Sequence, residues 1–182
     1  MPPIGKSLTC TVLTESEAIA RLCTACGMCC NGALFADVEL QVDDDAAALE
    51  KLGLRVKRLK TKTKLTQPCA AFDGCHCRIY SNRPSRCKRF ECLQLIKVRN
   101  GETNPESALR SINDARRQIK RIEKLLETLG RNDTTLPLSR RFRRCLIAAE
   151  NGDWSADNLD TLAELQLTVH QFNVQLQRDF YP

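Results

Sequence analysis

The sequence is short of the bulky side chains that usually fill a protein core. Among 182 residues it has six Phe, two Tyr and one Trp, so the core that it can build is modest. It contains no run of about 20 consecutive apolar residues, which excludes a transmembrane helix. Its first seven residues, MPPIGKS, lack the apolar segment of a secretory signal. We therefore expect a cytoplasmic protein, in which thiols stay reduced or bind metal.

Cysteine, in contrast, is abundant. The chain has eleven cysteines, and nine of them lie between residues 23 and 92. Two-residue spacing in the first group lets a pair of thiolates bind one metal ion from a tight turn, and the second group can complete the coordination. An odd total in a reducing compartment disfavours disulfides. Metal binding is therefore the central hypothesis. The first group is the run Cys23-x-x-Cys26-x-x-Cys29-Cys30, and the second is Cys69, Cys75, Cys77, Cys87 and Cys92.

The number of clustered thiols exceeds what one mononuclear site requires. Cys29 and Cys30 are adjacent, and successive side chains diverge, so one of the two is free for a second metal or for redox chemistry. We therefore expect either a polynuclear metal centre or two separate metal sites. Structural zinc takes four ligands, commonly cysteines. Iron-sulfur clusters also take four, often three closely spaced and one remote. We expect an iron-sulfur cluster or iron, with zinc as the alternative.

These residues carry a family resemblance. Cys23-x2-Cys26-x2-Cys29-Cys30, then Pro68-Cys69, then Cys77-x-Ile79-Tyr80-x2-Arg83-Pro84-x2-Cys87-x2-Phe90-x-Cys92 resembles the YkgJ-type cysteine-cluster family, described as a zinc- or iron-chelating domain. The resemblance covers roughly residues 20–95. It implies that the metal ligands are Cys23, Cys26, Cys29, Cys30, Cys69, Cys77 and Cys87, with Cys92 as a frequent companion.

Two neighbouring side chains are further candidate ligands. Cys75 is an addition inside the second group, and His76 between Cys75 and Cys77 is either a ligand or a solvent-facing loop residue. A similar cysteine signature occurs in flagellin lysine methylases, where it accompanies an iron-sulfur centre. Because this chain shows no glycine-rich cofactor loop and no catalytic set, we lean against enzyme activity. Cys145, in an apolar helical stretch, is expected in the core.

The excess of positive charge lies in the cysteine-rich half. Residues 1–100 hold 16 Lys and Arg against 10 Asp and Glu, whereas the rest of the chain is neutral. Several of these cations crowd around the second group of cysteines, where they offset thiolate charge: Arg78, Arg83, Arg86, Lys88 and Arg89. Nucleic acid is a weaker alternative partner, because no stacking aromatic residues accompany the lysines at 57–64.

The first half predicts short elements joined by loops. Thr14 is a candidate cap of a helix that leads into residues 23–32, which have two glycines and predict a metal-binding turn. A short strand is expected at 33–38 and a helix at 46–52, capped by the acidic run 43–45 and ended by Gly53. The basic stretch from residue 54 predicts an exposed strand, 78–80 another short strand, and Pro84 or Ser85 opens a helix through Phe90 toward residue 95.

The second half predicts helices. One runs from Asn104-Pro105 to Gly130, one from 139 to 150, and one from 155 or 156 to about 180. The first carries a heptad seam, which packs either within the chain or in a dimer, and we favour packing within the chain. The seam residues are Ala108, Ile112, Ala115, Ile119, Ile122, Leu126 and Leu129.

The sequence thus predicts an α+β protein in three parts. Residues 1–19 form an arm, 20–100 a small loop-rich, metal-binding cysteine domain, and 101–182 a helical, hairpin-like extension packed on it. The expected function is metal chelation, with a role in redox chemistry, metal handling or structural stabilisation. A metal-dependent modifying enzyme and a zinc-stabilised adaptor for nucleic acid or protein are the alternatives. No protein partner can be identified.

Overall fold

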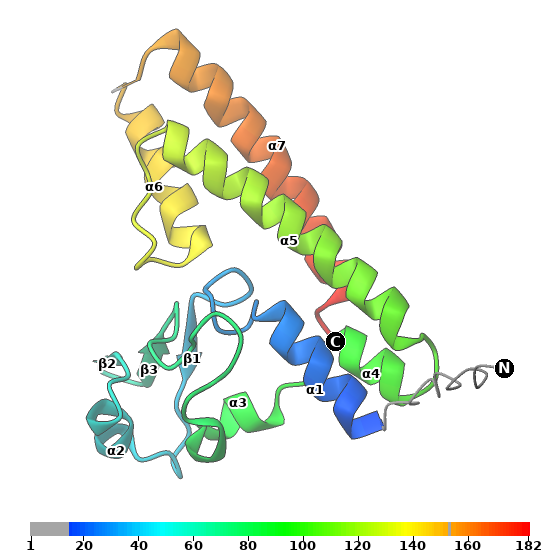
Figure 1. Ribbon diagram of the computed structural model, residues 1–182. Helices are drawn as coiled ribbons and strands as arrows, with labels where there is room; N and C mark the ends of the chain where they lie inside the picture. The colour runs from blue at the N-terminus through cyan, green and yellow to red at the C-terminus, as the bar shows by residue number, and fades with distance from the viewer. Residues whose placement is uncertain (1–14, 153) are drawn as a thin grey trace, which may run out of the picture.

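The structure, a computed structural model, describes residues 15–152 and 154–182. It confirms the α+β class, with a loop-rich cysteine region followed by helices (Figure 1). No helix in these two ranges is long and apolar enough to cross a membrane. In chain order the elements are α1 (Glu15–Cys26), β1 (Asp37–Glu39), α2 (Ala46–Lys51), β2 (Val56–Arg58), β3 (Thr63–Thr66), the 3₁₀ turn η1 (Tyr80–Asn82), α3 (Ser85–Arg89), α4 (Leu93–Arg99), α5 (Pro105–Thr128), α6 (Leu138–Glu150) and α7 (Ala156–Asp179).

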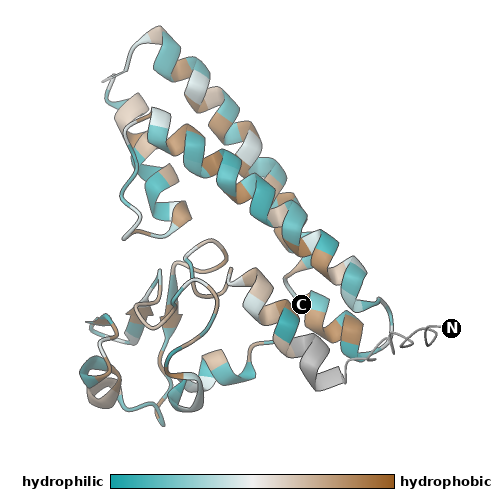
Figure 2. Cartoon of the chain, viewed as in Figure 1, coloured by the Kyte–Doolittle hydropathy of each residue, from teal (hydrophilic) through white to brown (hydrophobic). Residues whose placement is uncertain are grey.

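The helical half is a long antiparallel pair, α5 and α7, with the shorter α6 beside its far end (Figure 1). Asn104 caps α5 by accepting a hydrogen bond from Ser107 N–H at 2.8 Å, and Pro105 occupies the first turn, as the sequence predicts. Every residue of the predicted seam is buried. Figure 2 shows the resulting alternation of hydrophobic and hydrophilic residues along α5. Because α7 of the same chain covers this face, the seam packs intramolecularly.

The cysteine half contains a small antiparallel sheet in the order β1–β3–β2. Leu65 at the centre of β3 pairs with Val38 on one side and Val56 on the other. The basic stretch is therefore a hairpin of two strands, and the first strand begins later than predicted, at Asp37. Asp45 caps α2, which confirms that the acidic run is a helix start. The sheet side has its own core: Leu40, Leu49, Leu54, Leu65, Ala71 and Ile79.

Three local predictions in this half are wrong. The turn predicted at 23–32 is helical up to Cys26, because α1 continues until Gly27, which has a φ of +66°. Residues 78–80 are not a strand but lead into η1, where Asn82 N–H donates to the Ile79 carbonyl. The helix predicted through Phe90 breaks there into α3 and α4, since Phe90 has an extended backbone with a ψ of 122°, and its ring packs edge-on against Phe35 at 5.0 Å. The predicted cap Thr14 lies outside the described residues.

The C-terminus ties the two halves together. Leu93 N–H, at the start of α4, donates to the Phe180 carbonyl at 3.0 Å, and the Gln94 side chain donates to the Asp179 carbonyl at 2.8 Å. The Tyr181 hydroxyl donates to the Leu34 carbonyl at 2.9 Å. The end of α7 is thereby fixed beside the first cysteine segment and the start of α4. This contact sets the position of Cys92, which is the N-cap of α4.

A second contact joins the two cysteine segments. Cys69 N–H donates to the Cys30 carbonyl at 2.7 Å, and the Phe72 ring lies directly over Gly27. A Cβ atom added at Gly27 would stand 2.5 Å from Cζ of Phe72. Glycine is therefore required here twice, once for the positive φ and once for the close approach of the ring.

We expect Gly27→Ala to lower the free energy of unfolding by about 2–3 kcal/mol, because about 1 kcal/mol of left-handed backbone strain adds to the displacement of Phe72. Gly130→Ala is the matched control, since Gly130 has a φ of +68° but open space at its Cβ position. It should lose only the backbone contribution, about 1 kcal/mol. Urea denaturation measures both values. Equal losses in the two variants would contradict the role given to the Phe72 contact.

Candidate metal centre

The first cysteine segment spans the end of a helix and the turn after it. Cys23 and Cys26 occupy the last turn of α1, and Gly27 N–H donates to the Cys23 carbonyl at 3.2 Å. The chain then reverses, because Cys30 N–H donates back to the Gly27 carbonyl at 2.9 Å. Cys29 and Cys30 follow each other in this turn and carry their thiols toward different neighbours.

One set of four thiols lies on the helical side. Cys92, more than sixty residues along the chain, joins the first segment here. The charges of these four cysteines influence one another in every pairwise combination. Cys26, Cys29 and Cys92 also pack against the larger, helical core. We call these four the helix-side set: Cys23, Cys26, Cys29 and Cys92.

A second set of four thiols lies on the sheet side. Cys30 reaches the loop of residues 69–77, where an isolated bridge between Phe72 and Cys77 folds the chain back so that Cys77 returns to Cys69. Cys87 comes from the short helix α3. Here too, every pair is electrostatically coupled, and Cys69 and Cys77 pack against the smaller core. We call these four the sheet-side set: Cys30, Cys69, Cys77 and Cys87.

The two sets meet at the adjacent residues Cys29 and Cys30. The charge of Cys30 affects Cys29. The thiols with the largest influence on Cys23, Cys26, Cys30, Cys69 and Cys87 belong in each case to the same set. The two sets also pack on different cores. This division agrees with the expectation that neighbouring side chains diverge at this point of the chain.

The thiols are held largely away from water. Burial is the largest cause that raises the pKa of Cys30, and the neighbouring thiolates add to it. Together they raise the pKa of Cys30 to about 12. Burial raises the pKa of Cys26 to about 12 and that of Cys87 to about 11. Cys23 is the exposed member of the helix-side set, and its pKa is raised as well. Without a metal these groups are therefore protonated thiols at neutral pH, and a metal ion that binds them must displace protons.

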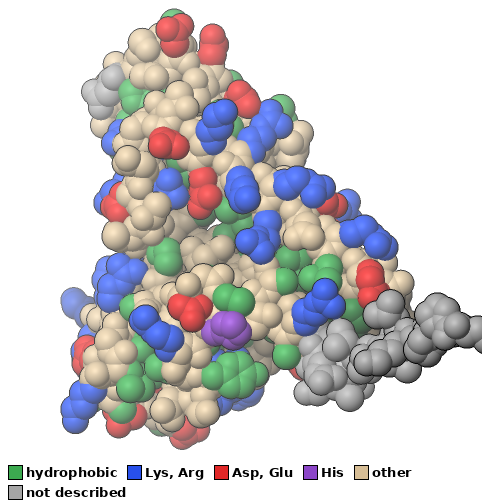
Figure 3. All heavy atoms as spheres, viewed as in Figure 1, with side chains coloured by type: hydrophobic (Ala, Val, Ile, Leu, Met, Phe, Trp, Pro, Cys, Tyr) green, Lys and Arg blue, Asp and Glu red, His purple; other side chains and the backbone are tan. Residues whose placement is uncertain are grey.

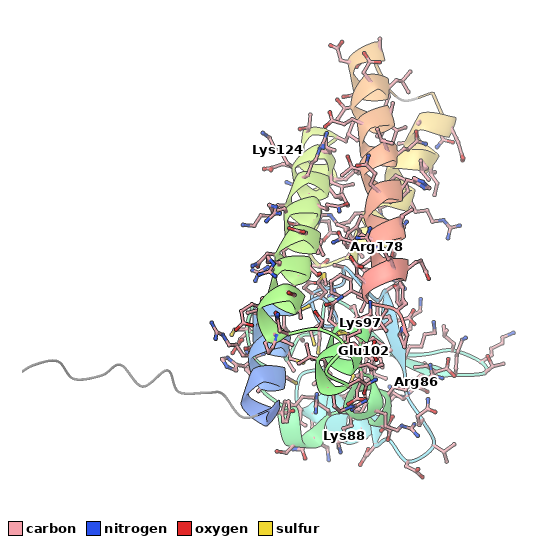
Figure 4. All side chains as sticks on the ribbon, turned by 90° about the vertical axis from the view of Figure 1, so that its right-hand side faces the viewer. Arg86, Lys88, Lys97, Glu102, Lys124 and Arg178 are labelled. Atoms are coloured by element: carbon pink, nitrogen blue, oxygen red, sulfur yellow. The ribbon has the colours of Figure 1, made fainter. Side chains whose placement is uncertain are left out.

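Arg83 stands beside both sets. Its positive charge favours the thiolate form of Cys30, Cys87 and Cys23, against the stronger effect of burial. The guanidinium lies 3.8 Å from the centre of the Tyr80 ring, and its Nε donates to the Tyr80 carbonyl at 3.1 Å. Arg83 is thus held in place to offset negative charge. Of the predicted cations, Arg78, Arg86, Lys88 and Arg89 are exposed, and Figure 4 shows Arg86 and Lys88 at the outer surface.

Two more cations near the thiols were not singled out from the sequence. Arg116 on α5 donates to the Ala25 carbonyl and favours the thiolate of Cys26. Arg55 donates to the Pro68 carbonyl at 2.7 Å and favours the thiolate of Cys69. Both arginines are distant in sequence from the cysteines that they approach, so no local pattern marks them.

The donor atoms suit zinc or iron, since clustered thiolates are preferred ligands of both. Every cysteine that the structure describes is a free thiol. Across residues 15–152 and 154–182, however, no group of three or more His, Cys, Asp or Glu side chains is arranged as ligands around one point. The thiols of each set are neighbours, and binding would require their side chains to turn toward a common centre.

The remaining candidates lie apart from the two sets. Cys75 and His76 are exposed at the tip of the 69–77 loop, with Sγ of Cys75 3.9 Å from Nε2 of His76. Asp73 shapes this tip by accepting hydrogen bonds from both of their backbone N–H groups. Whether either side chain binds metal stays a prediction. Cys145 is fully buried in the helical core, as expected.

Comparisons with known proteins bear on the same region. No curated protein and no solved structure matches the chain. One family model does match, over residues 22–128, which is more than half of the chain and includes all eight cysteines of the two sets. Its description is a putative zinc- or iron-chelating domain. The chain therefore belongs to the CxxCxxCC family.

Proposed function

We propose that the protein chelates metal at two separate centres, one on each set of four thiols. The observation that carries this proposal is the division of eight cysteines into two groups of four, each coupled within itself and packed on its own core. Four thiolates match the full ligand shell of a zinc ion or of an iron-sulfur cluster. The reduced state of the thiols suits the cytoplasm, where we place the protein.

The helix-side set favours an iron-sulfur cluster. Cys23, Cys26 and Cys29 are closely spaced and Cys92 is remote, which is the pattern of ligands that such clusters often use. The sheet-side set has no such run, because its members come from four separate points of the chain. Its thiols suit zinc or iron, and its position on the smaller core supports a structural role there. A cluster on the other set would serve redox chemistry or metal handling.

Protein purified without oxygen should therefore be brown, with broad visible absorption and acid-labile sulfide. Cys92→Ser should abolish the colour and sulfide, since it removes a ligand from the helix-side set, while metal on the sheet-side set remains. Cys87→Ser should remove metal from the sheet-side set, while the colour and the sulfide remain. Cys75→Ser is the control, because this exposed thiol lies outside both sets.

Metal and sulfide analysis of the wild type and the three variants distinguishes two separate centres from one shared centre. A colourless wild-type protein with stoichiometric zinc would refute the iron-sulfur assignment but leave two centres standing. Loss of all metal from both Cys92→Ser and Cys87→Ser, with each variant still folded by circular dichroism, would mean one shared polynuclear centre instead.

Removal of metal should loosen the sheet side first. The sheet has short strands and a small core, and domains of this kind commonly depend on a metal for stability. After treatment with a chelator, amides of β1–β3 should lose protection against hydrogen exchange by about a hundredfold or more, whereas those of α5 and α7 should change little. Unchanged protection of the strands in the metal-free protein would rule out the structural role.

Metal uptake should release protons. Burial raises the pKa of all four thiols of the helix-side set, so they are protonated at neutral pH. A zinc ion that binds these four as thiolates therefore displaces about four protons. The apparent affinity for zinc should therefore rise as the pH increases from about 6 to about 8 and fall as it decreases. Calorimetry of Zn²⁺ binding to metal-free protein, in buffers of different ionisation enthalpy, counts the protons. A count near zero would mean that the thiols are already ionised.

A further inference from the structure

A pocket of about 240 Å³ lies where the cysteine region meets the helices. One side is formed by the two cysteine segments, including Asn31, Pro68 and Cys69. The other side is formed by α5 and by the start of α6, including Glu123 and Arg141. At roughly 30 Å³ for each water-sized group, the pocket has room for a small molecule of about eight such groups. Cys69, a member of the sheet-side set, is thus part of its wall.

Arg141 is the unusual group in this wall. It is only 5% exposed, whereas Arg143 and Arg144 on the same helix are exposed. Its Nε donates to the Arg131 carbonyl at 2.9 Å. Within the described residues its two Nη groups make no hydrogen bond and no ion pair, although a guanidinium carries four N–H donors there. Asp133 interacts with Arg141 electrostatically but makes no ion pair with it. An anion in the pocket would therefore add the direct partner that this largely buried cation lacks.

The surrounding charges favour an anion beside Arg141. The pocket adjoins the first turn of α6, a helix of 13 residues. The N–H groups of Leu138, Arg140 and Arg141 already donate to the carbonyls of Gly32 and Pro137 there, so this end of the helix contributes its dipole and not a set of free donors. A helix N-terminus carries a partial positive charge and commonly binds oxyanions. Asp133, the carboxylate near Arg141, is already engaged by Arg144 at 3.5 Å and by hydrogen bonds from Thr135. Glu123, the acidic residue of the wall, is exposed to solvent and so is screened.

We propose that this pocket binds a small oxyanion, a phosphate or carboxylate group, whose oxygens accept hydrogen bonds from the Nη groups of Arg141. A planar guanidinium suits two oxygens of such a group. The site does not require metal, but a ligand held there lies against Cys69, so it would contact the sheet-side centre when that centre is occupied. Figure 3 shows several basic side chains over the long helices on one face of the molecule, and their charge would attract anions to the protein.

The test is a titration of the protein as purified with sodium phosphate, against sodium chloride at equal ionic strength. Two-dimensional NMR should show saturable shifts at the Arg141 side chain and in the first turn of α6. Arg141→Gln should weaken binding by about tenfold or more. Arg143→Gln, which removes an exposed arginine from the same helix, should keep the wild-type affinity within about twofold.

Arg141→Lys tests whether weaker binding reflects the lost hydrogen bonds and not a change of fold. It keeps the positive charge but loses the paired donors, so it should remain folded by circular dichroism and bind phosphate several-fold more weakly than the wild type. Non-saturable shifts in the wild type, saturable shifts that leave α6 unaffected, or equal losses in Arg141→Gln and Arg143→Gln would each overturn the proposal. Because phosphate binding is measured apart from metal content, such a failure would not affect the two metal centres.

Discussion

The contact between the two cysteine segments is the constraint on which the rest of the site depends. Cys69 N–H bonds to the Cys30 carbonyl, and the Phe72 ring lies against Gly27, so the 69–77 loop is placed beside the end of α1. If this contact were lost, Cys30 would be separated from its three partners. The helix-side set depends on a different contact, the bond from Leu93 N–H to the Phe180 carbonyl, which sets Cys92 in place. Each group of thiols is thus assembled by backbone interactions and does not rely on the metal alone.

Burial of the thiols and the nearby arginines have opposite effects on the pKa values of the thiols. Burial disfavours thiolates, which protects the thiols from oxidation while no metal is present. Arg83, Arg55 and Arg116 favour thiolates, and each is anchored by a hydrogen bond to a backbone carbonyl. A bound metal ion brings the remaining positive charge that ionisation requires. The four thiols of the helix-side set therefore stay neutral without metal and become thiolates when a cation binds.

Elements bounded by strong local signals were predictable from the sequence. Asn104 and Gly130 delimit α5, and the heptad pattern identified its buried face. Elements whose ends meet distant parts of the chain were not. At the start of α4, Leu93 N–H donates to the Phe180 carbonyl, and no local pattern indicates that contact. Membership of the cysteines in a metal-binding family was also predictable. Their grouping was not, since sequence order alone would keep Cys30 with Cys29, and the division of the chain at residue 100 stays a prediction.

The helical half contributes directly to the surroundings of the cysteines. Arg116 of α5 reaches the end of α1, and Arg141 of α6 lines the pocket that contains Cys69. The family match likewise continues through the whole of α5, well past the last clustered cysteine. If the helices only supported the fold, burial of Arg141 with Nη groups that make no hydrogen bond would destabilise the protein without serving a function. The position of Arg141 in the wall of the pocket that Cys69 also lines is better explained if the helices supply an anion-binding side of that pocket.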